Sequence, residues 1–334
     1  MSAADAFAAA GIEPVELREK EGLALINGTD GMTGMLVLAI HDLRHLLRVA
    51  DIAVSLSLEG LRGNAAVFAD DLQELRPHPG QRASASNIRA VTHGSELIHG
   101  ERDSDTVRTQ DAYSLRCSPQ VHGAARDTVD HAARVAGHEL NSSIDNPVVT
   151  HDYRVESNGN FHGAPVAYVL DFLAIAVADV ASMSERRTDR FLDKSRNFGL
   201  PPFLADRAGV DSGLMIAQYT AAGIVSELKR LAVPASAMQE DHVSMGWAAG
   251  RKLRTAIDGL SRVLAIEILT ACRGIALRAE KPSPASAPVV DLVNVVTGGP
   301  GPDRFLSPAI EAVVDLVQSG RILSTTEAVT GTLD

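Results

Sequence analysis

The strongest constraint on this chain is a series of long stretches in which apolar residues recur every three or four positions. In residues 36–61 these apolar positions are Leu36, Ile40, Leu43, Leu47, Ala50 and Val54. Such spacing places the apolar side chains on one face of an α-helix and the charged residues between them on the other face. It predicts a helix over 36–61 that ends near Gly60 or Gly63.

Further stretches with helical character lie at residues 164–190, 212–232, 247–279 and 307–317. The first is apolar on all sides, as expected of a helix at the centre of a bundle. The third could form about 45 Å of helix, at ~1.5 Å per residue, before Pro282 stops it. Strand signals are confined to residues 13–17 and 148–156. We therefore predict an all-α fold, an elongated helical bundle with short strands only in its connectors.

The sequence shows no internal division. It contains no repeat, no low-complexity tract and no clear linker, and its 334 residues are enough for one large core. We predict a single mainly helical domain over residues 1–334, with a core bundle at about 31–280 and a C-terminal helical extension at about 281–334.

Charge and cysteine content narrow the function classes. With 31 Lys+Arg against 42 Asp+Glu the formal net charge is −11, and no basic run appears, which argues against nucleic acid. The two cysteines, Cys117 and Cys272, cannot form a disulfide framework. No continuous apolar run reaches the roughly 20 residues of a membrane span, and no secretory leader opens the sequence. We predict a cytoplasmic protein that does not bind membranes.

Polar residues gather between the predicted helices. Asn27 follows an apolar stretch and is either a hydrogen-bonding site residue or part of an Asn-Gly turn that caps the next helix. Tyr113 and Arg116 are three residues apart, so a helical turn puts them on one face, with Gln110 one turn earlier. The fork of the Arg116 guanidinium suits a carboxylate ligand, and the alternative is a surface ion pair with Asp111 or another acid.

Other segments allow both a functional and an ordinary interpretation. Residues 141–147 and 158–163 are dense in amides, which also serve ordinary turns, and residues 239–242 read Gln-Glu-Asp-His, which also suits the start of a helix. His41 and His45 lie one helical turn apart, but no third ligand accompanies them, so no metal site is predicted. The chain has no P-loop, dinucleotide fingerprint or nucleophile elbow.

Taken together and in order, these segments resemble the histidine ammonia-lyase family, whose enzymes convert L-histidine to urocanate and ammonia. The matching stretches, between residues 21 and 246, read EGLALINGTDGM, VRTQDAYSLRCSPQVHG, ELNSSIDNP, NGNFHG, SRNFGLPPFL, SGLMIAQYTAA and QEDHVSMG. The resemblance implies a homotetramer built around a helical bundle, with active sites assembled from several chains.

The resemblance also implies roles for matching residues. Asn27 and Phe161 match residues near the family's electrophilic cofactor, a methylidene-imidazolone (MIO) ring, and Asn27 also contacts the substrate. Gln110 and Tyr113 match polar residues that line the site, Tyr113 being one of the two catalytic candidates. Arg116 matches the arginine that binds the substrate carboxylate.

Glu240 matches the acidic residue associated with histidine-type substrates, and it is the second catalytic candidate. A carboxylate there can accept the N–H of an imidazole or pair with its charged form.

The chain departs from the family pattern in two places. The MIO ring forms from an internal Ala-Ser-Gly tripeptide, and none occurs here. The resemblance places that tripeptide, and the tyrosine loop assigned to proton abstraction, before the present residue 1. We therefore expect a C-terminal portion that is inactive, or nearly so, by itself. The family also has a longer loop where only two residues separate Ser236 from Gln239.

Three hypotheses stay open at this stage. The chain is an ammonia-lyase piece that needs a separate cofactor-bearing segment, or a truncated relative that acts as a binding or structural protein. The third possibility is an MIO enzyme with another aromatic substrate or an aminomutase outcome, against which Glu240 argues.

Overall fold

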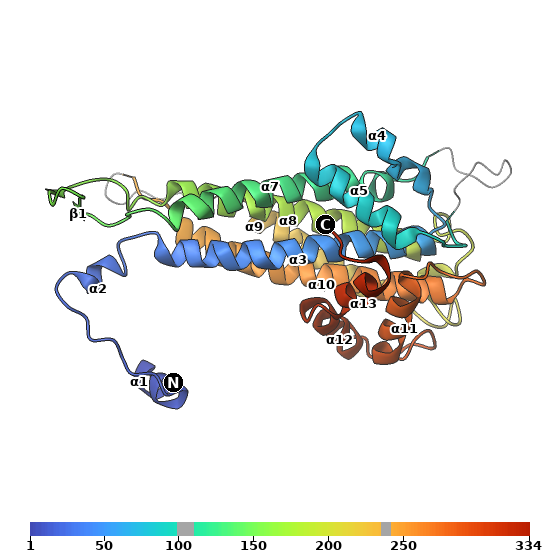
Figure 1. Cartoon of the computed structure of the whole chain (residues 1–334). Helices are drawn as coiled ribbons and strands as arrows, with labels where there is room; N and C mark the ends of the chain where they lie inside the picture. Colours follow the sequence, from blue (N-terminus) through green and yellow to red (C-terminus); the bar gives the residue numbers. More distant parts are fainter. Residues whose placement is uncertain (99–109, 235–241) are drawn as a thin grey trace.

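Long helices set the shape of the molecule. A computed structural model describes residues 1–98, 110–234 and 242–334. Its long helices are α3 (Asp30–Gly60), α7 (Ser118–Glu139), α8 (Ala164–Leu192), α9 (Met215–Leu231) and α10 (Gly246–Ala276). They run alongside one another as an elongated bundle, with the N-terminal segment reaching away from it (Figure 1). The predicted all-α bundle is confirmed.

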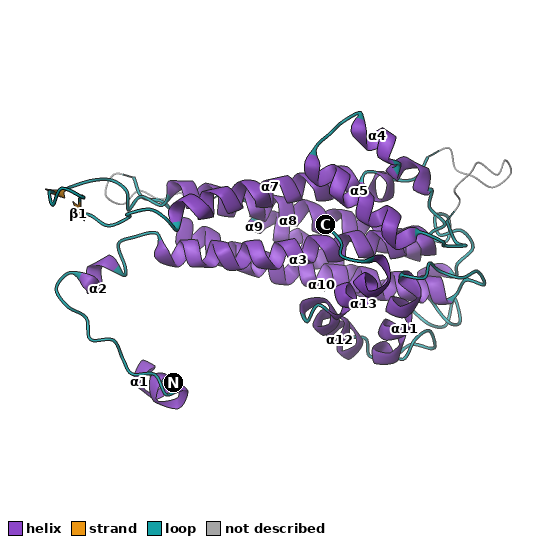
Figure 2. Ribbon diagram, in the orientation of Figure 1, coloured by secondary structure: helices purple, strands orange, loops and turns teal. Residues whose placement is uncertain are grey.

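Shorter elements decorate this bundle, and helices dominate throughout (Figure 2). They are α1 (Ala3–Ala10), α2 (Glu21–Ala24), η1 (Ala65–Phe68), α4 (Asp70–Glu74), α5 (Pro79–Thr92), α6 (Tyr113–Arg116), η2 (Pro202–Leu204), α11 (Ser286–Thr297), α12 (Ser307–Gln318) and α13 (Arg321–Thr330). Strands β1 (Val148–Val149) and β2 (Val155–Glu156) pair antiparallel, which confirms the hairpin predicted at 148–156. The strand predicted at 13–17 is wrong, because these exposed residues form no strand and pair with no other segment that the structure describes.

The spacing of apolar residues predicted the helices whose buried faces carry large side chains. It missed helices whose buried faces consist of small residues. The stretches predicted at 36–61, 164–190, 212–232, 247–279 and 307–317 all contain helices, with ends shifted by a few residues. Helix α7 escaped prediction although its buried positions Ala125, Val129, Ala132 and Ala136 keep helical spacing. Alanine contributes little apolar contrast, so the pattern is faint beside that of α3.

A buried ion pair joins three of the long helices. The Arg187 side chain on α8 is fully buried, and its Nε and Nη2 donate to the two carboxylate oxygens of Glu267 on α10 at 2.5 and 2.8 Å. The Ser57 hydroxyl on α3 donates to the same carboxylate at 2.7 Å. Arg187 also donates to the Ser114 carbonyl on α6 at 3.0 Å. Because each charge meets several polar partners, burial of the pair is tolerated.

Helix α8 combines a buried role with an apolar composition. Within the described residues it is the helix that is long and apolar enough to cross a membrane, although 61% of its most apolar window is buried inside the bundle. A criterion based on continuous apolar runs does not identify this helix, because polar residues interrupt its apolar stretches. Its exposed side carries the apolar residues Tyr168, Phe172 and Ile175, spaced four and three residues apart.

Helices α5 and α7 approach each other through glycine. A Cβ atom built on Gly123 would lie 2.3 Å from the backbone nitrogen of Gln81, and one built on Gly80 would lie 2.3 Å from the carbonyl oxygen of Gly123. These are backbone atoms, which cannot move aside as a flexible side chain can. Only glycine at both positions therefore allows this helix contact.

We expect Gly123→Ala to lower the free energy of unfolding by about 2 kcal/mol or more, since overpacking costs roughly 1–3 kcal/mol. Gly137→Ala, on the same helix with no neighbour within 4 Å, is the matched control. It should stabilise the protein by about 0.5–1 kcal/mol through helix propensity. Urea unfolding followed by circular dichroism tests both, and equal effects would contradict the close-contact explanation.

A second buried charge lies where α3, α5 and α7 meet. The Asp51 carboxylate is fully buried and accepts hydrogen bonds from Asn87 at 2.9 Å and Arg126 at 2.6 Å, with His122 Nδ1 at 2.7 Å. Burial alone would raise the pKa of Asp51, but the charge of Arg126 and the hydrogen bond to His122 outweigh it. The pKa is held below its ordinary value of 3.8.

Because the folded-state pKa of Asp51 is lowered, its stabilising contribution is present above the unfolded-state pKa and is lost as the pH falls through the folded-state pKa. We expect Asp51→Asn to cost about 3–5 kcal/mol at neutral pH. The difference from the unsubstituted protein should narrow as the pH falls below the ordinary Asp pKa of 3.8. Asp130→Asn, which removes an exposed partner of Arg44, should cost about 0–1 kcal/mol. A pH-independent difference in urea unfolding would argue against this account.

Candidate functional site

The predicted site residues lie at two opposite ends of the bundle. Asn27 and Phe161 lie where α3 and α8 begin, whereas Gln110, Tyr113 and Arg116 lie where α7 begins (Figure 1). Helix α7 runs between the two ends, and its 22 residues span about 33 Å at ~1.5 Å per residue. One chain by itself does not bring all of the predicted residues into one pocket.

At the first end, contacts with α7 and the loop that follows it hold the Asn27 segment. The Asn27 backbone N–H donates to the Leu23 carbonyl at 2.8 Å, which closes the turn after α2. Two residues on, the buried Thr29 hydroxyl donates to Glu139 at the end of α7. Thr29, and not Asn27, occupies the N-cap position of α3, so the interpretation of Asn27 as the helix cap is wrong.

The amides of residues 141–147 and 158–163 largely bond to each other. Asn146 Oδ1 accepts the backbone N–H of Asn158 at 3.0 Å, and Asn158 Nδ2 donates to the Asp145 carbonyl at 3.0 Å. Asn160 Nδ2 donates to the Ser143 carbonyl at 3.1 Å. These bonds hold the two segments together. This is the ordinary turn-forming role that the sequence allowed as the alternative to a functional one.

Phe161 lies beside a stacked histidine pair. The rings of His162 and His242 stack with centroids 5.5 Å apart and planes within 16°, and His162 Nε2 lies 3.2 Å from the His242 carbonyl oxygen. The pair fastens the segment before α8 to the segment before α10. Glu240 lies outside the described residues, two positions before His242 in the sequence.

At the second end, Arg116 is oriented by its own segment. Its Nε donates to the Asp111 carbonyl at 2.9 Å, and its Nη2 donates to Gln110 Oε1 at 2.9 Å. The guanidinium carbon lies 4.7 Å from the ring centre of Tyr113, which confirms that these two side chains share a face. The alternative of an Arg116–Asp111 ion pair is not what the structure shows, because Arg116 contacts the backbone of Asp111 and the Asp111 carboxylate accepts the Asn64 N–H.

Two further arginines at this end escaped prediction. Arg278, just after α10, donates to the carbonyls of Gly60, Asn197 and Phe198 and so holds the SRNFGLPPFL segment against the end of α3. Burial, together with the charge of Arg62, lowers the pKa of Arg278 to about 10. Burial and the neighbouring charge of Arg196 lower the pKa of Arg190 on α8. Neither arginine belongs to a motif that periodicity could single out.

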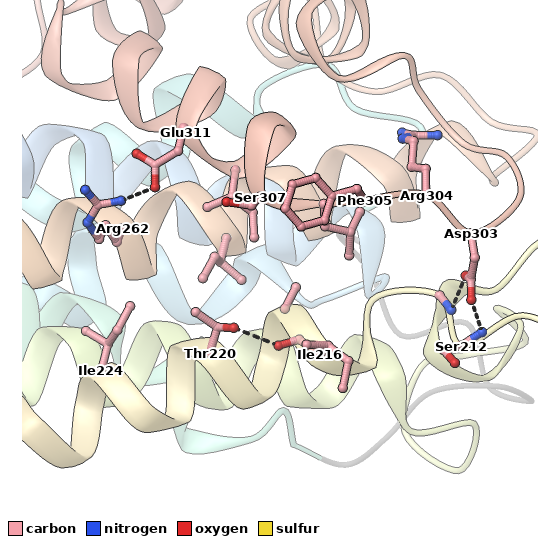
Figure 3. A pocket seen from close by; sticks show the side chains of 15 residues that line it. Ser212, Ile216, Thr220, Ile224, Arg262, Asp303, Arg304, Phe305, Ser307 and Glu311 are labelled. Atoms are coloured by element: carbon pink, nitrogen blue, oxygen red, sulfur yellow. Dashed lines mark hydrogen bonds and ion pairs between the residues drawn. The ribbon is translucent and has the colours of Figure 1, made fainter.

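A separate cavity of about 450 Å³ lies between α9, α10 and residues 303–311 (Figure 3). None of the predicted site residues that the structure describes lines it. Its charged groups bond to protein atoms: Arg262 pairs with Glu311, and Asp303 accepts the backbone N–H groups of Ser212 at 2.6 Å and Gly213 at 2.8 Å. Its remaining lining is mostly aliphatic, so we place no catalytic site there.

The histidine pair on α3 has its own surroundings. His45 Nε2 lies 2.7 Å from the Val317 carbonyl at the end of α12, and His41 is exposed. Asp42 between them contacts Arg254 on α10. These contacts join α3 to α12 and α10, which is an ordinary helix-packing role.

Comparison with known proteins decides the family. A family model described as aromatic amino acid lyase matches residues 1–295. The chain belongs to the aromatic amino acid lyase family. The resemblance read from the sequence motifs is thereby confirmed.

This aromatic amino acid lyase family member is 62% identical to the histidine ammonia-lyase of Streptomyces griseus, over 99% of this chain and 66% of that relative. It is 45% identical to the histidine ammonia-lyase of Symbiobacterium thermophilum, over 100% of this chain and 67% of that relative. The chain thus spans about two thirds of the length of these relatives.

Solved structures agree with the family assignment. Tyrosine aminomutase from Streptomyces globisporus aligns with a TM-score of 0.91 at 36% identity, covering 99% of this chain and 68% of that one. Histidine ammonia-lyase from Trypanosoma cruzi aligns with a TM-score of 0.87 at 37% identity, covering 97% of this chain and 63% of that one. Lyase and aminomutase therefore share this helical fold, so the fold alone does not choose the reaction.

The stacked histidines of this lyase-family chain make a testable contribution. We expect His162→Ala to speed amide hydrogen exchange roughly three- to tenfold in residues 157–163 and 242–246, since an aromatic pair contributes roughly 0.5–1.5 kcal/mol. His162→Phe, which keeps a flat ring, should change exchange less. His151→Ala in the exposed hairpin is the control. Unchanged exchange in His162→Ala would show that the pair does not fasten these segments.

Proposed function

We propose that this chain provides the substrate-binding portion of an ammonia-lyase that converts L-histidine to urocanate and ammonia. The observation that carries the proposal is the oriented Arg116 guanidinium in a member of the aromatic amino acid lyase family. The 62% identity to a histidine ammonia-lyase supports histidine over other aromatic amino acids.

Arg116 suits the carboxylate of an amino acid. A guanidinium has five N–H donors, and two of these are directed to the Asp111 carbonyl and to Gln110. Of the other three, one on Nη1 and one on Nη2 would form an edge at which a carboxylate can accept two parallel hydrogen bonds. Arg116 would thus hold one end of the substrate while Gln110 and Tyr113 line the site around it.

The catalytic candidates act at other parts of the substrate. We propose that Glu240 contacts the imidazole, because a carboxylate can accept its N–H or pair with its charged form. The Tyr113 phenol is 70% exposed in the single chain and stacks on Arg116, so it can reach a group bound there. A phenol so placed can exchange a proton with the substrate as a general acid or base.

The separation of the two ends supports a site shared between chains. Arg116 and Phe161 lie at opposite ends of α7, so a second copy running the other way would bring one chain's Arg116 near the other's Phe161. The exposed apolar stripe Tyr168, Phe172 and Ile175 on α8 offers a surface for such packing. We propose a homotetramer on this basis. The cytoplasmic location stays a prediction from the sequence.

The surroundings of Asn27 suit the family's MIO ring. The half-buried Asn27 and Phe161 lie at the same end of the bundle and provide an amide and an aromatic face for a flat polar ring. When bound, that ring supplies the electrophile that activates the substrate's amino group. The 334 residues contain no Ala-Ser-Gly tripeptide, so we propose that a segment beyond them contributes the ring.

Complementation tests the proposed activity. We would co-produce the chain with the part of the Streptomyces griseus relative that it does not cover, and follow urocanate by its absorbance. Urocanate formation is expected. Faster deamination of phenylalanine or tyrosine, or a β-amino acid product, would overturn the histidine assignment, and an assembled but inactive complex would favour a binding or structural protein.

Within that assembly we expect Arg116→Ala to lower kcat/KM for L-histidine by about 10- to 100-fold, the effect of a charge-assisted hydrogen bond of roughly 1.5–3 kcal/mol. Arg116→Lys keeps the charge but not the fork, so it should restore only part of the loss. Arg82→Ala on α5, which removes another exposed arginine, should leave the rate unchanged. An Arg116→Ala variant with unchanged kcat/KM would contradict the assigned role.

A further inference from the structure

The support for Arg116 extends to a residue that no motif assigned a role. Asp111 directly follows Gln110 and is only 8% exposed. Its carboxylate Oδ2 accepts the backbone N–H of Asn64 at 2.7 Å, in the loop that follows α3. Its backbone carbonyl accepts Arg116 Nε–H at 2.9 Å. One residue therefore links the guanidinium of Arg116 to the end of a long core helix.

The loop that anchors Asp111 is itself tightly held. The Gly63 N–H donates to the Leu58 carbonyl at 2.7 Å, which ends α3. A Cβ atom on Gly63 would lie 2.5 Å from Leu58 Cδ2 and 3.4 Å from Asp111 Oδ2. Asn64 Oδ1 in turn accepts the Ala66 N–H at 2.8 Å and starts η1. The carboxylate of Asp111 thus bonds to a loop whose backbone is hydrogen-bonded on both sides of Asn64.

Positive charge faces the same carboxylate from another helix. Arg190 on α8 interacts electrostatically with Asp111, while Arg196, Asp189 and Asp193 surround Arg190. The Asp111 carboxylate therefore interacts with the charge of Arg190 on α8 as well as with the Asn64 N–H in the loop after α3.

We propose that Asp111 is a positioning residue for the substrate carboxylate: its buried side chain fixes the backbone carbonyl that aims the Arg116 fork. The inference rests on the proposed carboxylate-binding role of Arg116. A bidentate contact requires the plane of the guanidinium to be set, and the Nε bond to Asp111 together with the Gln110 bond sets that plane. The Oδ2 bond to the Asn64 N–H helps to hold the residue whose carbonyl accepts Arg116 Nε–H.

A matched pair of unreactive ligands tests this inference without requiring turnover. Imidazole-4-propionate carries the imidazole and carboxylate of the substrate, and its carboxamide is a neutral isostere. Calorimetric titration into the complemented assembly should show tighter binding of the acid, and Arg116→Ala should remove that preference. Asp111→Ala should reduce the preference about tenfold, which corresponds to about 1.4 kcal/mol.

Conservative and control variants separate positioning from general damage. Asp111→Asn keeps an oxygen that accepts the Asn64 N–H, so it should retain the preference within about twofold. Asp130→Ala removes an exposed carboxylate on α7 and should change nothing. If Asp111→Ala does not fold, Asn64→Pro removes the donor N–H, and Asn64→Ala, which keeps it, is the comparison.

The outcomes distinguish the two claims. If Arg116→Ala removes the preference and Asp111→Ala leaves it intact, the positioning role is overturned and the proposed function stands. Equal loss of acid and amide binding in Asp111→Ala would also overturn positioning, because it would indicate general damage. If the unsubstituted assembly shows no preference for the acid, the role of Arg116 fails and the inference fails with it.

Discussion

The rest of this structure depends on a buried salt bridge between long helices, near the end of the bundle that holds Ser114. Arg187 and Glu267 join α8 to α10, and Ser57 brings α3 to the same carboxylate. Charges taken out of water are stable only when their geometry and hydrogen bonds are nearly complete, so the pair tolerates few relative positions of these helices. A purely aliphatic core would allow more sliding. The salt bridge therefore helps to set the helix register, and with it the place of every loop at either end.

That register has a direct consequence for function. Rigid helices about 30–45 Å long at ~1.5 Å per residue keep their two ends apart, and the chemistry-bearing loops are divided between those ends. The end with Arg116 offers a cation in a fixed orientation, and the end with Phe161 offers amides and aromatic rings. The proposed shared site follows from this division, and the exposed apolar stripe on α8 offers a surface for the proposed association of chains.

Much of the fold was predictable because it follows from local spacing. The helices at 36–61, 164–190 and 247–279 were predictable from their many large apolar residues. These three are the core helices. Helix α7 did not, since alanine and glycine provide its packing surface and its contact with α5 depends on Gly80 and Gly123. Such a contact is a property of two segments, and neither segment reveals it alone.

The sequence by itself determined the all-helical class, the order of the polar segments and the shared face of Tyr113 and Arg116, because these depend on residues a few positions apart. Only the tertiary structure decided that Arg116 donates to the Asp111 backbone carbonyl and not to its carboxylate. Likewise, it decided that the histidines of two distant segments stack. It also decided that the predicted site residues lie at opposite ends of one chain. These outcomes depend on which helix ends meet in space, and helix direction and register are set by burial across the whole bundle.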